Sequence, residues 1–444
     1  MEDETDVLII GAGAAGLVAA RELSAADLKV IVLEARDRIG GRIHTHFDRF
    51  PIELGAEFVH GKPPETLAIV ERAHLTLEKI PNLHWHLHDG VLTKYGEFWS
   101  RVEKVMARMS EYTGPDQAFS EFLDDYKRKT DIEDIRSIAT LYVEGFHAAH
   151  ADNISVLGLN KTNKAAEEIE DDKQFRIEDG YKRLIESLHD DAVARGASFR
   201  LKAVVEVVNW KRDRVEVLTT TDKRFKARHL IITLPLPLLQ KSEQVRFNPP
   251  LTQTQNAANN LAMGHVIKVL LRFREPFWQD LRVPGEHDSL AELKDFTFIH
   301  SPDELFPTWW TQFPLDTPLL AGWAGGTRAE NLIGESNDAL LDHALETLTH
   351  VFRVSKASIE ERLVEFYTHD WQRDPFSAGA YSYIPVGGVE AQSQLAQSLE
   401  DTLFFAGEAT NTEGHHGTVH GAIATGLRAA REILSRRGFT DDAD

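Results

Sequence analysis

Cysteine is absent from the 444 residues of this chain. Its absence excludes disulfide bonds, thiolate metal sites, a cysteine nucleophile and a cysteinyl link to any cofactor. No run of about 18 apolar residues occurs either, so the sequence predicts no membrane-spanning helix. An apolar strand pattern already begins at Asp6, which leaves no room for a cleaved secretion signal and favours a cytoplasmic protein.

Positive charge is also scarce. Lys and Arg number 49 against 70 Asp and Glu, which gives a formal net charge of -21. A surface of that sign repels nucleic acid and anionic lipid, so neither is expected as a partner. Apolar residues still make up 42% of the chain, enough for large cores, and the length predicts at least two domains.

The first well-defined pattern is a strand, a turn and a helix. DVLII is an unbroken apolar run, typical of a parallel strand buried on both faces. Gly11, Gly13 and Gly16 follow with the spacing G-x-G-x-x-G, which allows a tight turn, close approach of a pyrophosphate and close helix packing. Residues 14–26 then predict a helix whose first N–H groups face the phosphates. Glu34 ends the next strand, where a carboxylate binds an adenosine ribose, so the pattern predicts a dinucleotide-binding unit.

The segments that follow carry a family resemblance. Glu34 with RDRIGGR resembles the extended FAD fingerprint of the flavin-dependent amine oxidases, a family that includes monoamine oxidases, polyamine oxidases and lysine-specific histone demethylases. IELGAEFVHG, HVIKVLLRF, GAYSYIPVG and LFFAGEATNTEGHHGTVHGA resemble further motifs of that family, in the same order. Residues 85–175 match poorly, and substrate choice is expected to vary there.

The resemblance implies that FAD is bound without a covalent link. The contacts it implies in the first part of the chain are Gly11, Gly13, Ala14, Ala15, Gly16, Glu34, Ala35, Arg36, Gly41 and Arg42. Those it implies later are Leu54, Gly55, Ala56, Glu57, Val204, Trp371, Gly407, Glu408, Thr418 and Val419. Glu408 is expected at the ribityl chain. The helix that begins near Thr418 is expected to face the flavin pyrimidine, where its dipole would stabilise negative charge on the reduced ring.

Four catalytic residues follow from the same resemblance: Lys268, Tyr381, Trp371 and His60. By strand alternation alone, Lys268 would point to solvent. The resemblance instead assigns it to a water near flavin N5. It places Tyr381 against the amine site, with Tyr383 expected on the same strand face, and Trp371 beside that site.

Several histidines could bind substrate or a metal ion. His60, or Glu57 three residues earlier, is expected to accept a hydrogen bond from a substrate ammonium. EGHHGTVHGA looks like a metal cluster, but its context predicts a flavin-binding turn in which His415 and His416 approach the substrate cavity. The alternating histidines of HWHLHDG would share a strand face, but no acidic partners are evident, so no metal site is predicted.

The implied fold class is α/β, with a Rossmann-like FAD-binding domain interleaved with an α+β substrate-binding domain. The predicted segments of the FAD-binding domain are 1–80, 176–262 and 395–444. Those of the substrate-binding domain are 81–175 and 263–394, with a helical insert near 97–150.

The implied reaction is oxidation of a small-molecule amine. A hydride would pass from the amine α-carbon to flavin N5, the imine would hydrolyse to a carbonyl product, and O2 would reoxidise the flavin and give hydrogen peroxide. His60 and the acidic balance lean towards polyamines, whereas Tyr381 with Thr418 resembles the demethylase branch. The alternatives are an L-amino-acid oxidase, a relative of the desaturases or porphyrinogen oxidases, and a flavin-bound partner-binding protein of low turnover. The sequence leaves the oligomeric state open.

Overall fold

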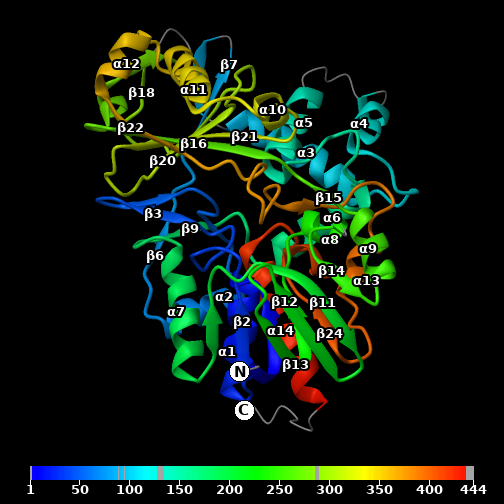
Figure 1. Ribbon diagram of the computed structural model, residues 1–444. Helices are drawn as coiled ribbons and strands as arrows, with labels where there is room; N and C mark the ends of the chain where they lie inside the picture. The colour runs from blue at the N-terminus through cyan, green and yellow to red at the C-terminus, as the bar shows by residue number, and fades with distance from the viewer. Residues whose placement is uncertain are drawn as a thin grey trace.

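The computed structural model describes residues 3–88, 90–94, 96–127, 135–241, 243–285 and 290–436. Two large sheets organise it, one in the lower half of Figure 1 and one in the upper half. The residues at 437–444, predicted to end the FAD-binding domain, lie outside the described part.

The lower sheet has eight strands. In spatial order they are β10 (Ser198–Arg200), β2 (Val30–Leu33), β1 (Asp3–Ile10), β13 (Arg224–Ile232), β12 (Arg214–Thr219), β11 (Val205–Lys211) and β14 (Arg246–Asn248), with β24 (Leu403–Phe405) paired to β13. The strand β1 runs parallel to both neighbours, with Val7 opposite Val30 and His229.

Alternation along β1 explains its continuous apolar run. Val7 and Ile9 pack against one side, and Leu8 and Ile10 against the other, where strands β11 and β12 supply the partners. The helices on the first side are α1 (Ala14–Ala25), α2 (Pro64–Arg72), α7 (Lys182–Ala194) and α14 (Val419–Ser435). The predicted strand, turn, helix and strand are therefore all present.

The upper sheet has seven strands. In spatial order they are β22 (Leu363–Thr368), β16 (Val266–Phe273), β21 (Leu319–Gly325), β20 (Thr308–Thr311), β19 (Phe298–His300), β7 (His84–His88) and β8 (Val91–Lys94). Helix α11 (Asn337–Phe352) packs on one face, with α10 (Thr327–Leu332) and α12 (Lys356–Arg362) beside it. The opposite face meets the loop around Leu54 and Phe58, which joins the two halves.

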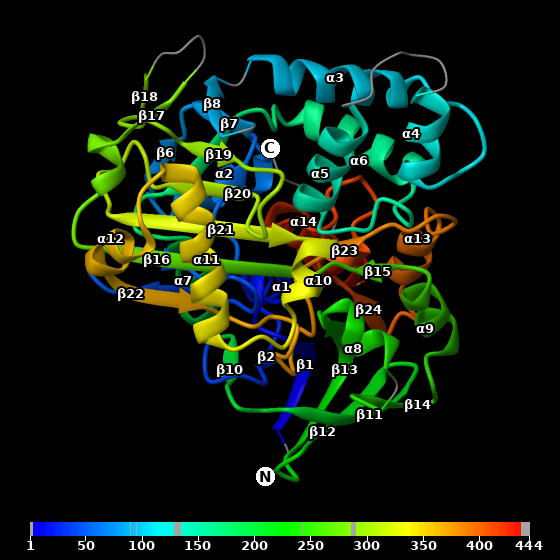
Figure 2. The same cartoon turned by 90° about the horizontal axis from the view of Figure 1, so that it is seen from above.

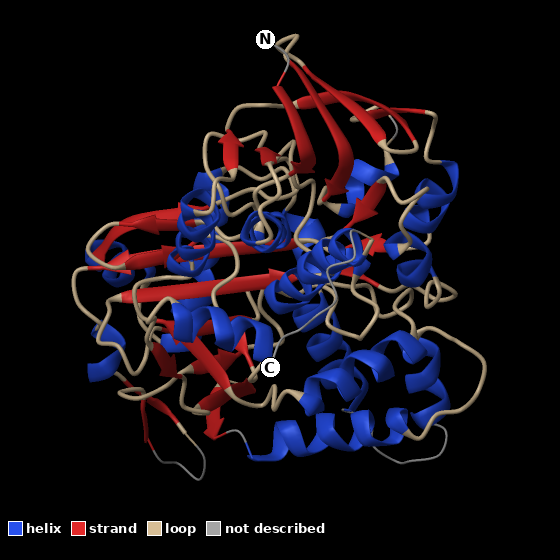
Figure 3. Ribbon diagram, turned by 90° about the horizontal axis from the view of Figure 1, so that it is seen from below, coloured by secondary structure: helices blue, strands red, loops and turns tan. Residues whose placement is uncertain are grey.

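A group of helices stands at one edge of the upper sheet (Figure 2). It comprises α3 (Gly96–Ser110), α4 (Phe119–Lys127), α5 (Ile135–His147) and α6 (Val156–Glu168), so helical structure extends past the insert predicted near 97–150. The same group is the cluster of helices at the lower right of Figure 3. Tyr383 is buried in the core of this group, and its hydroxyl accepts a hydrogen bond from Asn153. The expectation that Tyr383 shares a strand face with Tyr381 stays a prediction.

Short elements complete the fold. They are β3 (Thr45–Phe47), β4 (Pro51–Glu53), β5 (Val59–His60), β6 (Leu77–Lys79), β9 (Gln174–Ile177), β15 (Ala262–Met263), β17 (Arg282–Pro284), β18 (Leu290–Glu292), β23 (Ser382–Tyr383), α8 (Leu236–Gln240), α9 (Thr252–Asn259), α13 (Ala391–Ala396), η1 (Phe277–Asp280) and η3 (Glu408–Thr410). Among the described residues, no helix is both long and apolar enough to cross a bilayer.

Candidate active site

A cavity of about 1140 Å³ lies between the two halves and is lined by residues of both. The predicted site residues that line it are Gly11, Gly13, Ala14, Ala15, Glu34, Ala35, Arg36, Gly41, Arg42, Leu54, Gly55, Ala56, Glu57, His60, Val204, Lys268, Trp371, Tyr381, Gly407, Glu408, Thr418 and Val419. Gly16, predicted as a cofactor contact, is absent from the lining. A Cβ at Gly16 would lie 2.0 Å from the carbonyl oxygen of Gly11, so this glycine allows helix α1 to pack closely.

The start of α1 opens into the cavity. Its N-cap residue, Gly13, has no side chain, so no side-chain hydrogen bond caps the first N–H groups of the helix. A Cβ at Gly13 would meet nothing within 4 Å. Gly11 adopts a φ of +100°, which favours glycine. The open space and the uncapped N–H groups fit a diphosphate, whose negative charge the helix dipole stabilises.

Glu34 and Arg36 form the adjoining wall. Glu34 is 6% exposed, and its carboxylate accepts hydrogen bonds from the backbone N–H groups of Ala12, at 2.7 Å, and Arg36, at 2.8 Å. The Arg36 guanidinium forms an ion pair with Asp374, with N–O distances of 2.8 and 3.0 Å, and donates to the Ser377 hydroxyl. Both side chains are thus fixed at the mouth of the predicted ribose site.

Glu408 joins three segments of the cavity wall. Arg42 donates to one carboxylate oxygen at 2.8 Å, and the hydroxyl of Ser382 and the N–H of Gly417 donate to the other at 2.6 and 2.9 Å. Burial would raise the pKa of Glu408, but the charge of Arg42 and these hydrogen bonds lower it. The carboxylate is therefore ionised and held in one orientation.

Helix α14 also begins at the cavity. Its N-cap residue, Thr418, accepts a hydrogen bond from the N–H of Gly421 at 2.9 Å and donates to the carbonyl of His415 at 2.7 Å. Val419 is the first helical residue. The positive end of the helix dipole faces the cavity here, where it stabilises negative charge on a bound group.

Lys268 occupies the middle of the cavity wall, 3% exposed. It lies on a strand with neighbours on both sides, and its face of β16, shared with Leu270, meets the loop around Leu54 rather than solvent. Its ammonium donates to Glu57 at 2.7 Å and to the Gly55 carbonyl at 3.3 Å. The burial implied by the family resemblance is correct, and the solvent-facing expectation from alternation is wrong.

Tyr381, Trp371 and His60 surround the same region. The Tyr381 hydroxyl donates to the Phe146 carbonyl at 2.8 Å, and the Trp371 indole donates to the Leu54 carbonyl at 2.9 Å. The imidazole of His60 lies 3.7 Å from Asp171 and edge-on to the ring of Phe146. Their catalytic roles stay predictions, but their side chains are held by specific contacts at one cavity.

Comparison with known proteins now identifies the family. A family profile described as "Flavin containing amine oxidoreductase" matches residues 14–434. The chain belongs to the flavin-containing amine oxidoreductases. It is 29% identical to Polyamine oxidase 3 of Oryza sativa subsp. japonica, across 97% of this chain and 89% of that protein. It is 29% identical to the human Lysine-specific histone demethylase 2, across 97% of this chain and 53% of the demethylase.

Solved structures support the fold of this amine oxidoreductase. Putrescine oxidase bound to putrescine superposes with a TM-score of 0.82 and 22% identity, covering 98% of this chain and all of the other. Cyclohexylamine oxidase from Brevibacterium oxydans gives 0.80 at 20% identity, covering 98% and 99%. The predicted fold class, the FAD cofactor and the assignment as an amine-oxidising enzyme are confirmed.

Several residues of the amine oxidoreductase cavity were not predicted from the sequence. Phe146, Trp310 and Trp323 add aromatic walls, and the acidic residues Glu103, Glu167, Asp171 and Asp172 also line it. The tryptophans lie on the consecutive strands β20 and β21, whose pairing places their ring centroids 6.0 Å apart. The acidic residues come from the helical region that matches the family poorly, so no motif could identify them.

The histidines of the last motif line the cavity as well. His415, His416 and His420 all face it, and His420 is within 3.2 Å of His415. Burial lowers the pKa of His416 to about 4 and that of His420 to about 3, so both are neutral at pH 7. Across the described part of the chain, no group of three or more His, Asp or Glu residues has the arrangement of a metal site.

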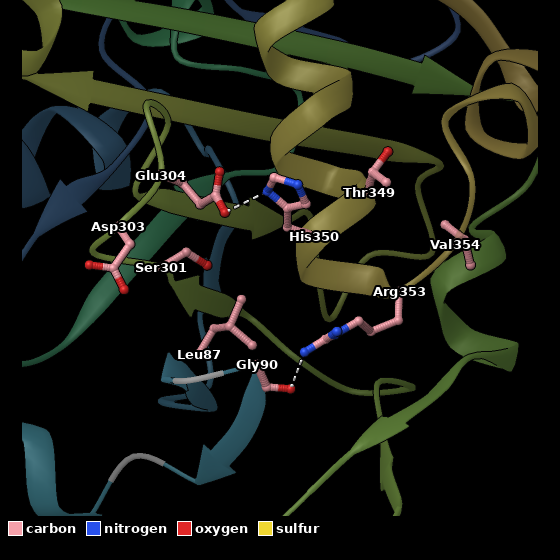
Figure 4. A pocket seen from close by; sticks show the side chains of 9 residues that line it. All are labelled: Leu87, Gly90, Ser301, Asp303, Glu304, Thr349, His350, Arg353 and Val354. Atoms are coloured by element: carbon pink, nitrogen blue, oxygen red, sulfur yellow. Dashed lines mark hydrogen bonds and ion pairs between the residues drawn. The ribbon is translucent and has the colours of Figure 1, made fainter.

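His84 of the alternating histidine motif has a different partner. Its Nδ1 lies 3.0 Å from Nε2 of His300, and the two rings stack with centroids 5.3 Å apart. Both rings line the cavity. A separate pocket of about 560 Å³, shown in Figure 4, contains a hydrogen bond between His350 and Glu304 and none of the predicted site residues.

Proposed function

We propose that this amine oxidoreductase oxidises a diamine or polyamine and that O2 reoxidises the flavin, giving hydrogen peroxide. The observation that carries the proposal is the mixed lining of the cavity. It combines aromatic side chains with Lys268 and Tyr381, and it also includes carboxylates: Glu103, Glu167, Asp171 and Asp172. An aliphatic chain with an amine at each end matches this lining, because one amine would be oxidised while the other, as an ammonium, binds a carboxylate.

The residues act by binding, orienting and excluding water. FAD, bound along Gly13, Glu34 and Glu408, supplies the hydride acceptor. Tyr381 walls the reacting amine. A hydride leaves only a neutral amine readily, and desolvation between the aromatic walls favours that neutral form.

Two further observations favour this substrate class. Polyamine oxidase 3 is covered over most of its length, whereas the chain spans about half of the human demethylase. Within the described residues, no arginine that lines the cavity is left without a carboxylate partner to bind an amino-acid carboxylate: Arg36 pairs with Asp374, and Arg42 pairs with Glu408.

A peroxide assay tests the proposal. Spermine, spermidine, putrescine, benzylamine, a methyl-lysine peptide and L-amino acids would be compared, with anaerobic bleaching of the flavin as a second measurement. We expect the di- and polyamines to give the highest kcat/KM. Turnover of L-amino acids alone would identify an amino-acid oxidase instead. If no amine reduces the flavin, the proposal of an amine oxidase is wrong.

The role of the acidic wall has its own test. Asp171→Asn should raise KM for spermidine about tenfold, because one charge-assisted hydrogen bond is lost, while KM for benzylamine stays within about twofold. Glu170→Gln is the matched control, because Glu170 lies next to Asp171 but its carboxylate pairs with Lys62. Equal effects of Asp171→Asn on both amines would contradict a role in binding the distal ammonium.

A further inference from the structure

Glu57 lies where the two halves of the molecule meet. It follows β4 in the loop that leads to β5, and its side chain is buried. Its donors come from three other strands or their ends: Lys268 on β16, Arg176 on β9, and Trp310 with Gln312 at the end of β20. One carboxylate therefore connects segments far apart in the sequence.

The acceptor capacity of this carboxylate is fully used. One oxygen accepts from Arg176 at 2.9 Å, Trp310 at 3.0 Å and Gln312 at 3.3 Å, and the other from Lys268 at 2.7 Å and Trp310 at 3.1 Å. A carboxylate offers about four acceptor positions. The prediction that Glu57 accepts a hydrogen bond from a substrate ammonium therefore lacks a vacant site, and His60 remains the candidate.

The charges of the cluster do not cancel. Glu57 is negative, and Lys268 and Arg176 are positive, with side chains 3 to 6% exposed. Burial would raise the pKa of Glu57, but the two cations lower it to about 2, so the carboxylate stays ionised. Without it, two buried cations would face each other unpaired, which is strongly destabilising.

The ammonium of Lys268 retains one N–H for the cavity. An ammonium has three donors, of which one goes to Glu57 and a longer one to the Gly55 carbonyl. These two contacts fix the direction of the third. The indole of Trp310, which donates to Glu57, lies against the same ammonium, with Nζ 5.4 Å from the ring centroid.

From this geometry we infer that Glu57 is a positioning residue for the reaction. It orients the Lys268 ammonium towards the cavity. Its negative charge offsets part of the positive charge of Lys268 and Arg176, and this lowers the midpoint potential of the bound flavin. The inference rests on the proposed role of Lys268 beside the flavin. It assigns Glu57 to the support of a catalytic residue rather than to FAD or substrate.

A double-mutant cycle tests the inference. The proteins are wild type, Glu57→Gln, Lys268→Met and the double variant, each loaded with FAD. The midpoint potential of the flavin is measured by anaerobic dithionite titration against a reference dye, without amine. The rate of flavin reduction by the best amine is measured by stopped flow.

We expect Glu57→Gln to raise the midpoint potential, because removing a negative charge favours the reduced, anionic flavin. We expect it to slow reduction by roughly 10- to 100-fold, because the ammonium loses its orientation. In the Lys268→Met background, Glu57→Gln should change the rate by less than about twofold, because no ammonium is left to orient, while the potential should rise as it does in the wild-type background. Equal changes of the rate in both backgrounds, or no change of the rate in either, would overturn the inference.

A matched control makes the same substitution at Glu53, a second buried glutamate, and is measured at about pH 6. Burial raises the pKa of Glu53 to about 7, so the amide in Glu53→Gln replaces a mostly neutral carboxyl whose bonds go to Thr45 and the Tyr181 N–H. This variant should leave the potential unchanged, because it removes little charge.

If Glu57→Gln does not fold or hold FAD, Glu57→Asp takes its place in the cycle. It keeps the charge but shortens the reach, so the potential should stay near wild type while reduction slows only where Lys268 is present. Because the potential is measured without amine, failure of every amine to reduce wild-type flavin would refute the proposed substrate class and leave the test of Glu57 intact.

Discussion

A buried lysine on a central strand is stable only with a buried counter-ion. Lys268 has Glu57 at 2.7 Å, and both side chains are 3% exposed. A cation held in a low-dielectric wall acts strongly on a bound group, because little water screens it. At the scale of single residues, the site therefore depends on ion pairs inside the wall as much as on side chains that touch substrate.

Lys268→Met should slow flavin reduction or reoxidation by about 100-fold while FAD stays bound, the scale seen when one preorganised electrostatic group is removed. Stopped-flow absorbance of both half-reactions measures this. Arg272→Met is the control, since Arg272 lies on the same strand but pairs with the exposed Glu365. Unchanged rates in both half-reactions would remove Lys268 from the mechanism.

Glu408→Gln should weaken FAD retention by about tenfold or more, because Arg42 loses its charge partner and a buried cation is left unpaired. The FAD content after gel filtration and the dissociation rate from flavin fluorescence report the loss. Glu413→Gln, an exposed residue of the same turn, should retain FAD as wild type does. Full FAD retention by Glu408→Gln would show that the carboxylate does not hold the cofactor site together.

The turn into α1 performs two separate tasks at the scale of an element. Gly13 leaves open space at the helix start, whereas Gly16 allows the helix to lie against the turn. The spacing G-x-G-x-x-G predicted both tasks, although the family resemblance also implied that Gly16 contacts FAD. Of the two glycines, only Gly13 lines the cavity.

Gly13→Ala and Gly16→Ala should therefore fail in different ways. A Cβ at Gly13 meets no protein atom, so the apoprotein should keep its Tm within about 1 °C while FAD affinity falls steeply. A Cβ at Gly16 strikes the Gly11 carbonyl, so the apoprotein Tm should fall by several degrees, as expected of overpacking that costs about 1 to 3 kcal/mol. Calorimetry of the apoproteins with FAD titrations compares them, and identical behaviour would contradict the division of tasks.

Local sequence patterns predicted the first strand, turn and helix well, because neighbouring residues determine these elements. The apolar run of β1, the glycine turn and the strand ending at Glu34 each follow from neighbouring residues. The environment of Lys268 does not, since alternation alone sends it to solvent and only the distant loop around Leu54 covers its face of β16. Arg176 carried no signal, because its partner Glu57 is 119 residues away.

At the scale of the whole molecule, buried neutral histidines couple stability to pH. His147, His416 and His420 are buried at the cavity, and burial lowers the pKa of each from 6.5 to about 3, 4 and 3. A proton therefore binds the unfolded chain more tightly than the folded one. Their stabilising effect is complete above pH 6.5 and is lost as pH falls towards 4.

The Tm should therefore fall by several degrees between about pH 7 and pH 5, above the range in which most carboxylates titrate. Glu53 acts in the opposite direction, because its raised pKa of about 7 makes the folded state bind the proton, but it is one group against three histidines. His416→Gln should flatten the slope, and His350→Gln, at an exposed position, should not. A Tm that stays constant over this range would contradict the coupling.

The strand order also constrains how the protein is made. Strand β1 needs β13, with Ile10 opposite Ile232, and β13 needs β24, with Ile232 opposite Phe405. The last wall of the cavity, at Thr418, is synthesised later still. The ribosome synthesises the chain at about 5 to 20 residues per second, so tens of seconds pass between synthesis of the first glycine turn and completion of the cavity. Strand β1 can therefore pair with β2 early but must wait for β13, and FAD can be loaded only once nearly the whole chain has emerged.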